Sequence, residues 1–270
     1  MMRLKIVIKI GGDLVKGDFP PGLLADIKRL SSTNEVLLVH GGGDVVTEIA
    51  TKLGKEQRFV VSPEGVRSRY TDRETIDIYT MVMSGMIAKK LVQLLAKEGV
   101  KAVSLTGLDG TLLQASRKKR LVIMDERGRR VAVEGGYTGK MRSIDSTVIE
   151  ALLSRSLMPV VSPVAMGEEG EPLNVDSDRA ATYLAAGLRA DAVIFVTDVS
   201  GLMLDEKRID HMSTEEARSA MPRIGFGMQK KVLAGIEAVE GGVKEAIICT
   251  GFRDEPIGTA LRHEECTVIS

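Results

Sequence analysis

Short apolar runs alternate with amphipathic stretches along almost the whole chain, and this alternation constrains the fold more than any other feature. The apolar runs predict strands at 4–10, 35–39, 101–105, 158–162, 191–197 and 244–249. The amphipathic stretches predict helices at 22–31, 43–53, 72–98, 140–154, 177–187, 213–220 and 227–240. Because helical crossovers cover both faces of a parallel sheet, the predicted fold class is α/β, a three-layer αβα sandwich with a mainly parallel central sheet.

One segment departs from this alternation. Residues 111–136 contain the apolar run 121–124 and the run 129–133, which is apolar from Val131 on, and the short polar turn 125–128 separates them. Two such runs around a polar turn are typical of a β-hairpin. We therefore expect a β-hairpin that projects from the sheet.

Composition limits both the function and the organisation of the chain. Its 270 residues include 37 Lys and Arg against 37 Asp and Glu, so no overall charge indicates a nucleic acid or membrane partner. We find no signal peptide and no apolar run of the roughly 20 residues that span a bilayer. Cys249 and Cys266 fit no metal-binding spacing and suit a reducing cytosol, so we expect a cytoplasmic protein without a metal site. A polar loop at 167–171 predicts a soft boundary between 1–170 and 171–270, within one continuous sheet.

Two glycine strings directly follow predicted strands. Gly11–Gly12 ends the run 4–10, and Gly41–Gly43 ends the run 35–39. Backbone N–H groups that no side chain covers attract anionic oxygens, especially where a helix follows. Neither string is a GxGxxG or a complete P-loop motif, so phosphate binding here must use another geometry. The strings predict a site for a phosphate or for a phosphoryl group in transfer.

Lys9 lies inside the first apolar run, immediately before the first glycine string. A lone lysine in a strand is more often an edge residue whose ammonium reaches solvent. A strand-end ammonium beside bare N–H groups can instead hold phosphate oxygens and offset charge during transfer. Its position favours the functional interpretation.

Polar side chains at other predicted element ends could complete such a site. The segment Asn174–Asp178 opens a helix and contains more carboxylates than capping requires. Thr197–Gly201 ends a strand, as a simple turn or as part of a nucleotide pocket. Lys231 lies in the first turn of a helix, where a cation opposes the helix dipole and so hints at an anion nearby. Arg69 could clamp a carboxylate, although a surface arginine is the simpler interpretation.

The hairpin region carries a run of positive charge in a chain without net charge. These residues are Arg117, Lys118, Lys119 and Arg120, followed by Arg127, Arg129 and Arg130. Charge runs are usually solvated faces. On an element that projects from the sheet, this run could instead dock an acidic partner.

Together these motifs resemble the amino-acid kinase family, in its N-acetylglutamate kinase group, over essentially the whole chain. The motifs that occur in family order are Lys9–Gly12, His40–Gly43, Arg69–Asp72, Asn174–Asp178, Thr197–Gly201 and Gly227–Lys231. Within the group, the chain is most similar to archaeal kinases whose substrate is bound to a carrier protein. The segments that carry this closer similarity are 62–71, 106–110, 117–120 and 134–140.

The resemblance implies a role for each matched residue. Lys9 and Lys231 would stabilise the transferring phosphoryl group, and Asp178 would orient the two lysines. The backbone N–H groups that would line the reacting oxygens belong to Gly11, Gly12, Gly42 and Gly43. The residues that would hold the α-carboxylate region of the substrate are Arg69 and Asn174. The residues that would belong to the ATP half are Thr197, Asp198 and Gly201.

The implied reaction is ATP-dependent phosphorylation of the side-chain carboxylate of 2-aminoadipate, glutamate or both, with Mg²⁺. The amino group of the substrate would be attached to a small acidic amino-group carrier protein of the LysW type, and the product would be an acyl phosphate in lysine or arginine biosynthesis. A carboxylate is already a nucleophile, so no general base is needed, and we interpret His40 as a turn or core residue. Residues 1–170 would form the acceptor and dimerisation lobe, and 171–270 the ATP lobe. The chain begins at its first strand, so we expect a homodimer without arginine feedback.

Two alternatives remain open. The chain could be an ordinary N-acetylglutamate kinase that acts on a free acetylated substrate, with the basic hairpin as plain surface. More remotely, it could bind a nucleotide without catalysing transfer, which would leave Lys9 and Lys231 without a task.

Overall fold

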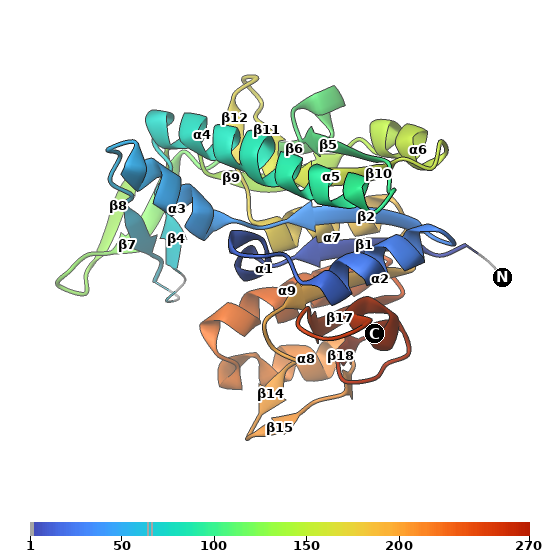
Figure 1. Cartoon of the computed structure of the whole chain (residues 1–270). Coiled ribbons are helices and arrows are strands. Elements are labelled where there is room, and N and C mark those ends of the chain that lie inside the picture. Colours follow the sequence, from blue (N-terminus) through green and yellow to red (C-terminus); the bar gives the residue numbers. More distant parts are fainter. Residues whose placement is uncertain (1–2, 64, 66) are drawn as a thin grey trace.

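The structure is a computed structural model that describes residues 3–63, 65 and 67–270. An eight-stranded sheet lies at the centre of the molecule (Figure 1). In spatial order its strands are β16 (His211–Met212), β18 (Thr267–Ile269), β17 (Glu245–Thr250), β13 (Ala192–Thr197), β1 (Lys5–Ile10), β2 (Glu35–His40), β10 (Met158–Ser162) and β5 (Ala102–Thr106). Neighbours from β17 to β5 pair in parallel, whereas β18 runs antiparallel to β17. The predicted strands and the mainly parallel sheet are therefore confirmed.

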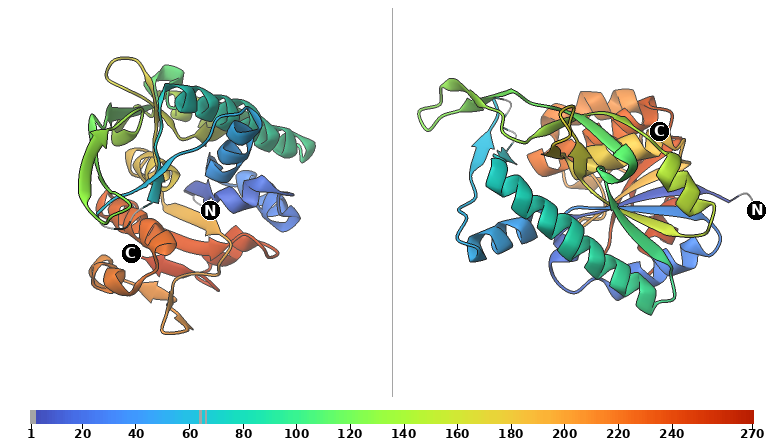
Figure 2. Two further views of the ribbon diagram at one scale, coloured as in Figure 1. Left: turned by 90° about the vertical axis from the view of Figure 1, so that its left-hand side faces the viewer. Right: turned by 90° about the horizontal axis from the view of Figure 1, so that it is seen from above.

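Helices cover both faces of this sheet, which confirms the three-layer arrangement (Figure 2). Along β1, Ile6, Ile8 and Ile10 face one layer and Val7 faces the other. The first layer contains α1 (Gly12–Lys16), α2 (Pro21–Ser31), α3 (Gly43–Lys52), α4 (Arg73–Thr80), α5 (Ala88–Lys97) and α10 (Pro256–Leu261). The second contains α6 (Thr147–Leu153), α7 (Ser177–Gly187), α8 (Thr214–Ala220) and α9 (Phe226–Glu240). The sequence did not predict α1 and α10, which have only 5 and 6 residues.

The predicted helix 72–98 is a helical run with an irregular centre. Between α4 and α5 lies the π-helical segment η1 (Met81–Ile87). By length and composition alone the run Arg73–Lys97 could cross a membrane. Its apolar side, which includes Ile76 and Leu91, is buried in the core of the protein. We therefore describe it as a core helix.

The predicted helix 140–154 is wrong in its first half. Residues Gly139–Ile144 form the strand β9, and only Thr147–Leu153 are helical. In β9, Met141 is buried while both its neighbours are exposed, because the strand pairs antiparallel with β6. Antiparallel pairing and this alternation override the helical spacing of the apolar residues. The four strands of this smaller sheet are, in order, β12 (Pro172–Asn174), β11 (Val164–Met166), β6 (Leu113–Arg117) and β9.

The predicted hairpin is confirmed, and it projects from the body of the molecule (Figures 1 and 2). Its strands are β7 (Arg120–Met124) and β8 (Arg130–Glu134). In the turn, the Asp125 carboxylate accepts hydrogen bonds from two backbone N–H groups, at 2.9 and 2.8 Å. The remaining short elements are β3 (Phe59–Val61), β4 (Arg67–Arg69), β14 (Met203–Leu204), β15 (Lys207–Arg208), η2 (Asp109–Thr111) and η3 (Met221–Arg223).

Candidate active site

Lys9 is a buried cation at the carboxyl end of the central strand. It pairs in register with Val39 of β2 and Phe195 of β13, and its side chain is only 6% exposed. Its Nζ atom lies 2.7 Å from Oδ1 of Asp178, so the two side chains form a buried ion pair. The interpretation of Lys9 as an edge residue whose ammonium reaches solvent is therefore excluded. A buried ammonium is stable here because a carboxylate faces it.

Asp178 lies in the first turn of α7, close to more than one positive charge. The side chain of Asp176 caps the helix by accepting hydrogen bonds from the N–H groups of Asp178 and Arg179, at 3.0 and 3.1 Å. Asp178 is thus free for another task. Burial alone would raise its pKa, but the positive charges of Lys9 and Lys231 outweigh burial and keep the pKa below its usual value. The carboxylate therefore stays ionised under the influence of both lysines.

The two glycine strings lie against each other, which the sequence did not show. A Cβ atom on Gly41 would lie 3.0 Å from the backbone N of Gly12, and one on Gly12 would lie 3.2 Å from that of Gly42. α1 begins at Gly12 and α3 begins at Gly43, and neither helix has a side-chain cap. The strings therefore form one surface of backbone at the ends of β1 and β2. Two uncapped helix starts on this surface offer N–H groups to an anion.

Arg69 is buried, contrary to the simple surface interpretation. From the end of β4 its Nη2 atom donates hydrogen bonds to the carbonyl of Gly43 at 2.6 Å and to Oγ1 of Thr47 at 2.8 Å. Its Nη1 atom donates to Oε1 of Gln57. Burial lowers the pKa of Arg69. The guanidinium thus joins the second glycine string to the chain that leads into β3.

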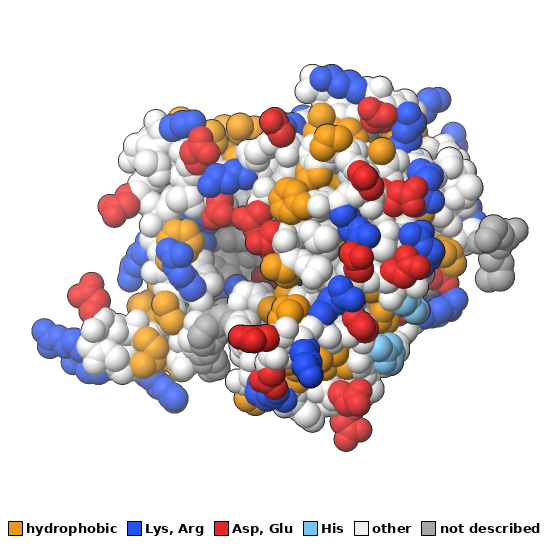
Figure 3. Space-filling view, turned by 60° about the horizontal axis from the view of Figure 1, so that its bottom comes forward, with side chains coloured by type: hydrophobic (Ala, Val, Ile, Leu, Met, Phe, Trp, Pro, Cys, Tyr) orange, Lys and Arg blue, Asp and Glu red, His pale blue; other side chains and the backbone are white. Residues whose placement is uncertain are grey.

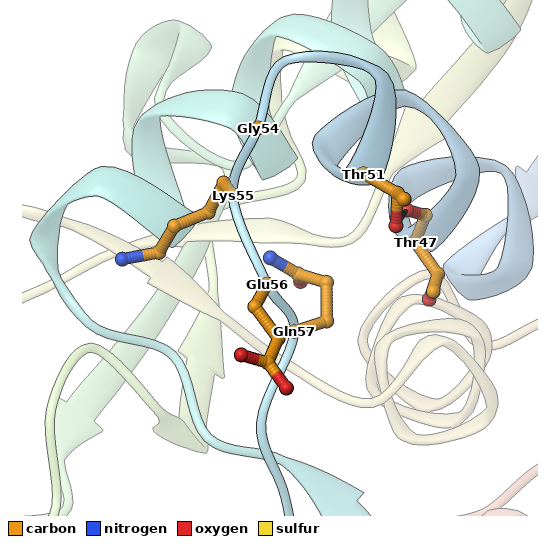
Figure 4. A pocket seen from close by; sticks show the side chains of 6 residues that line it. All are labelled: Thr47, Thr51, Gly54, Lys55, Glu56 and Gln57. Carbon is orange, nitrogen blue, oxygen red and sulfur yellow. Dashed lines mark hydrogen bonds between the residues drawn. The ribbon is translucent and has the colours of Figure 1, made fainter.

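The partners of Arg69 also line a cavity. A space of about 350 Å³ lies between the exposed side of α3, with Thr47 and Thr51, and the segment 54–57 (Figure 4). The amide Nε2 of Gln57 is buried here without a hydrogen-bond partner. Thr47 and Gln57 therefore hold Arg69 from the cavity side, and sequence reasoning identified neither of them.

Asn174 lies on the same side of the site as Arg69. Its Nδ2 atom donates a hydrogen bond to Oγ1 of Thr71 at 3.0 Å, and Thr71 is fully buried two residues beyond Arg69. The hydroxyl of Thr71 in turn lies 3.4 Å from the carbonyl oxygen of Arg69. The segment Arg69–Asp72 was selected as a motif, but its contact with Asn174 spans 103 residues of chain and has no local signal.

The residues predicted for the ATP half lie after the adjacent strand. Thr197 ends β13 and is buried, and its Oγ1 atom donates a hydrogen bond to Oδ1 of Asp198 at 3.0 Å. Gly201 has φ +152°, and a side chain there would press on Oγ1 of Thr267.

Among the residues that the structure describes, no group of three or more His, Cys, Asp or Glu could hold a metal ion.

Lys231 and its neighbour differ in their surroundings. Both are half-buried near the start of α9, but only Lys230 has a described contact, from Nζ to the carbonyl oxygen of Arg67 at 3.4 Å. The sequence favours Lys231 because Lys230 can face solvent, but Lys230 is half-buried and makes this contact. Lys231 acts on Asp178 through its charge.

The basic residues 117–120 lie where β6 passes into β7. Arg117 is partly anchored, because its Nε atom donates to the carbonyl of Gly136 at 2.5 Å and its guanidinium lies 4.3 Å from the ring centre of Tyr137. Lys118, Lys119 and Arg120 are exposed. In the space-filling view, Lys and Arg side chains gather at the end of the projecting hairpin (Figure 3).

The buried histidine at the end of β2 leads to a stability prediction. Burial lowers the pKa of His40 from 6.5 to about 4. The unfolded chain therefore binds a proton below pH 6.5 that the folded protein takes up only near pH 4. We expect the free energy of unfolding to fall by about 3 kcal/mol as the pH is lowered from 6.5 to about 4, because the unfolded chain then binds a proton at this one group. Denaturant titrations at several pH values, with His40→Asn as the comparison, measure the effect, and an equal pH dependence in the variant would contradict it.

Comparison with known proteins agrees with the chemistry of this site. A sequence model of the amino acid kinase family matches residues 4–250. A protein of Cenarchaeum symbiosum (strain A) named "Putative [LysW]-aminoadipate/[LysW]-glutamate kinase" is 53% identical over 264 residues, 98% of each chain. A protein of Saccharolobus islandicus named "[LysW]-aminoadipate/[LysW]-glutamate kinase" is 42% identical over 266 residues, 98% of this chain and 99% of the relative.

Solved structures support the fold. Carbamate kinase from Giardia lamblia bound to AMP-PNP superposes with a TM-score of 0.71 at 17% identity, over 99% of this chain and 98% of that one. N-acetylglutamate synthase from Neisseria gonorrhoeae superposes with a TM-score of 0.79 at 22% identity, over 100% of this chain and 60% of that one. At these identities the similarity concerns the architecture alone.

Proposed function

Because this chain belongs to the amino acid kinase family, we propose that it transfers a phosphoryl group from ATP to the side-chain carboxylate of 2-aminoadipate, glutamate or both. The substrate is attached through its amino group to an acidic amino-group carrier protein of the LysW type. The product is an acyl phosphate for lysine or arginine biosynthesis. The observation that carries the proposal is the buried pair of Lys9 and Asp178 beside two glycine strings, in a chain whose full-length relatives carry this name.

The chemistry requires placement and charge neutralisation rather than proton transfer. The acceptor carboxylate attacks directly, so the site needs no base, and His40 is neutral and fully occupied by other contacts. In this proposal Lys9 approaches the reacting oxygens from the glycine side and Lys231 from the nucleotide side. Asp178 is paired with Lys9 and lies within the electrostatic influence of Lys231. The backbone donors in this proposal are the N–H groups of Gly12, Gly42 and Gly43. The expected donor Gly11 is corrected, because its N–H group already donates a hydrogen bond to the carbonyl of Val196 at 2.9 Å.

The remaining assignments follow the two halves of the sheet. Two residues hold the α-carboxylate region of the substrate. Arg69 belongs to the lobe 1–170, and Asn174 lies near the start of the lobe 171–270. The residues of the ATP half are Thr197, Asp198 and Gly201. Mg²⁺ enters as part of the co-substrate MgATP, since Mg²⁺ at kinase sites is held mainly by phosphates, water and one or two carboxylates. Asp178 is poorly suited to coordinate it, because its Oδ1 atom faces Lys9.

We assign the docking of the carrier protein to the basic run Arg117, Lys118, Lys119 and Arg120. Reversing the charge at Lys118, Lys119 and Arg120 should raise KM for the carrier-bound substrate by about tenfold or more at low salt, because steering between opposite charges is lost. The difference from the wild type should shrink as salt is added. Initial rates at several ionic strengths measure this effect.

A matched control reverses three exposed cations elsewhere, at Lys97, Arg155 and Arg189. It changes the net charge equally but leaves the hairpin intact. If both triple variants have the same KM at every salt concentration, the hairpin does not dock the carrier.

An acyl-phosphate assay with ATP tests the function itself. The four substrates are acetylglutamate, acetylaminoadipate and the carrier-bound forms of glutamate and aminoadipate. We expect turnover of at least one carrier-bound form to exceed turnover of both free forms. Preference for free acetylglutamate would establish the alternative, an ordinary N-acetylglutamate kinase.

We also propose a cytoplasmic homodimer that has neither a nucleic acid nor a membrane as partner. Met81 and Met86 of η1 are 53% and 51% exposed, although large apolar side chains are usually covered. A second copy of the chain would cover them. Sedimentation of the wild type and of a Met81→Lys, Met86→Lys variant measures the association.

A further inference from the structure

His40 is fully buried directly before the second glycine string, and the proposed chemistry gives it no role. Its Nδ1 atom lies 2.9 Å from the carbonyl oxygen of Gly41. Its Nε2 atom lies 2.9 Å from Oγ of Ser162, a fully buried residue at the end of β10. The same Oγ atom lies 3.2 Å from the carbonyl oxygen of Met83 in η1. These contacts connect the glycine string to two other elements of the core.

Counting protons assigns the direction of each hydrogen bond. The carbonyl of Gly41 can only accept, so Nδ1 of His40 carries the proton. Because the imidazole is neutral at pH 7, its Nε2 atom accepts the proton of the Ser162 hydroxyl. That hydroxyl has a single proton, so the carbonyl of Met83 competes with His40 for it.

The peptide between Gly41 and Gly42 packs against the backbone of Gly12, and among the described residues His40 is its only hydrogen-bond partner. Glycine lies on both sides of it, so a rotation of this peptide plane meets few steric barriers. A planar trans peptide directs its N–H opposite to its carbonyl, so fixing the carbonyl of Gly41 also fixes the N–H of Gly42. Gly42 itself has φ +145°, and a side chain there would collide with Ile87 of η1.

We propose that His40 is a positioning residue that prevents this peptide from rotating and so holds the N–H of Gly42 toward the reacting oxygens. Ser162 holds the imidazole in the tautomer and orientation that this task requires. His40 exchanges no proton with substrate. The proposal rests on the proposed role of Gly42 as a donor to the substrate or the phosphoryl group.

Two amide variants test the two ring nitrogens of His40 separately. Asparagine places an N–H near Nδ1 and so preserves the bond to Gly41, whereas glutamine places its amide near Nε2 and preserves the bond to Ser162. We expect kcat to fall about tenfold to hundredfold in His40→Gln and only a few-fold in His40→Asn, with a similar loss of thermal stability in both. The dissociation constant for MgATP should be nearly unchanged. Equal losses of kcat in both variants would overturn the proposal.

Spectroscopy tests the assignment without any substrate, and so independently of the proposed function. In the ¹⁵N-histidine-labelled protein, the His40 signal should show a protonated Nδ1 and an unprotonated Nε2 between about pH 6 and pH 8. His40→Asn assigns the signal among those of His211 and His263. Protonation at Nε2 would overturn the proposal even if the enzyme is active. Should His40→Gln not fold, Ser162→Ala replaces it, with a shift of the His40 tautomer signal as the expected result and an unchanged signal as the contrary one.

Discussion

Replacing Lys9 with methionine should lower kcat by about two to four orders of magnitude, with much less effect on the dissociation constant for MgATP. Methionine keeps most of the volume of the lysine but removes the charge that offsets the developing phosphoryl charge in a buried site. An interaction made mainly in the transition state affects kcat rather than ground-state binding. Acyl-phosphate formation under saturating substrates and calorimetric titration with MgATP measure the two quantities.

Lys97→Met is the matched control, since this lysine is exposed near the end of α5 and far along the chain from the site. It should leave both quantities unchanged. A Lys9→Met enzyme with normal turnover would remove the central argument for phosphoryl transfer here. It would favour the remote alternative, a module that binds nucleotide without catalysis.

The second large effect concerns stability. Asp178→Asn should lower the free energy of unfolding by about 3–5 kcal/mol, because Lys9 then remains buried without a carboxylate that compensates its charge. Lys9→Met should be destabilising for the reciprocal reason, although Lys231 still faces Asp178. The double variant should lose clearly less than the two single losses combined, since neither charge remains unpaired.

Denaturant unfolding of all four proteins at pH 7 completes this cycle. A second cycle with the exposed pair Lys52 and Glu48, 2.7 Å apart on α3, is the control and should show a coupling below about 1 kcal/mol. If the losses for Lys9 and Asp178 are simply additive, the two side chains are not coupled in solution.

The sequence predicted six of the eight strands of the central sheet because each of these carries its own signal, whereas β16 and β18, with two and three residues, were not predicted. Buried parallel strands are continuous apolar runs, and these need no knowledge of distant residues. The region 140–144 failed because an edge strand with one buried residue, Met141, has the same apolar spacing as the start of a helix. Its pairing partner β6 lies more than 20 residues away and gives no local signal.

For the site, the sequence identified residues but not their contacts. Lys9 and Asp178 were each suspected from local context, yet the distance between them depends on how α7 packs on β1. Thr71, Thr47 and Gln57 were not identified as partners of Asn174 and Arg69, because a buried hydroxyl or amide has no sequence pattern of its own. Contacts between distant segments of the chain come only from the assembled fold.

The pairing of β1 with β13 has a mechanical consequence. Five residue pairs join these strands, and they connect the proposed acceptor half of the sheet to the proposed nucleotide half without interruption. A hinge between the proposed halves would have to break this ladder, so we expect Lys9 on β1 and the proposed nucleotide residues at the end of β13 to keep a fixed separation. We therefore expect any opening and closing for substrate exchange to come from elements at the rim of the sheet, such as the projecting hairpin, while the paired strands stay rigid.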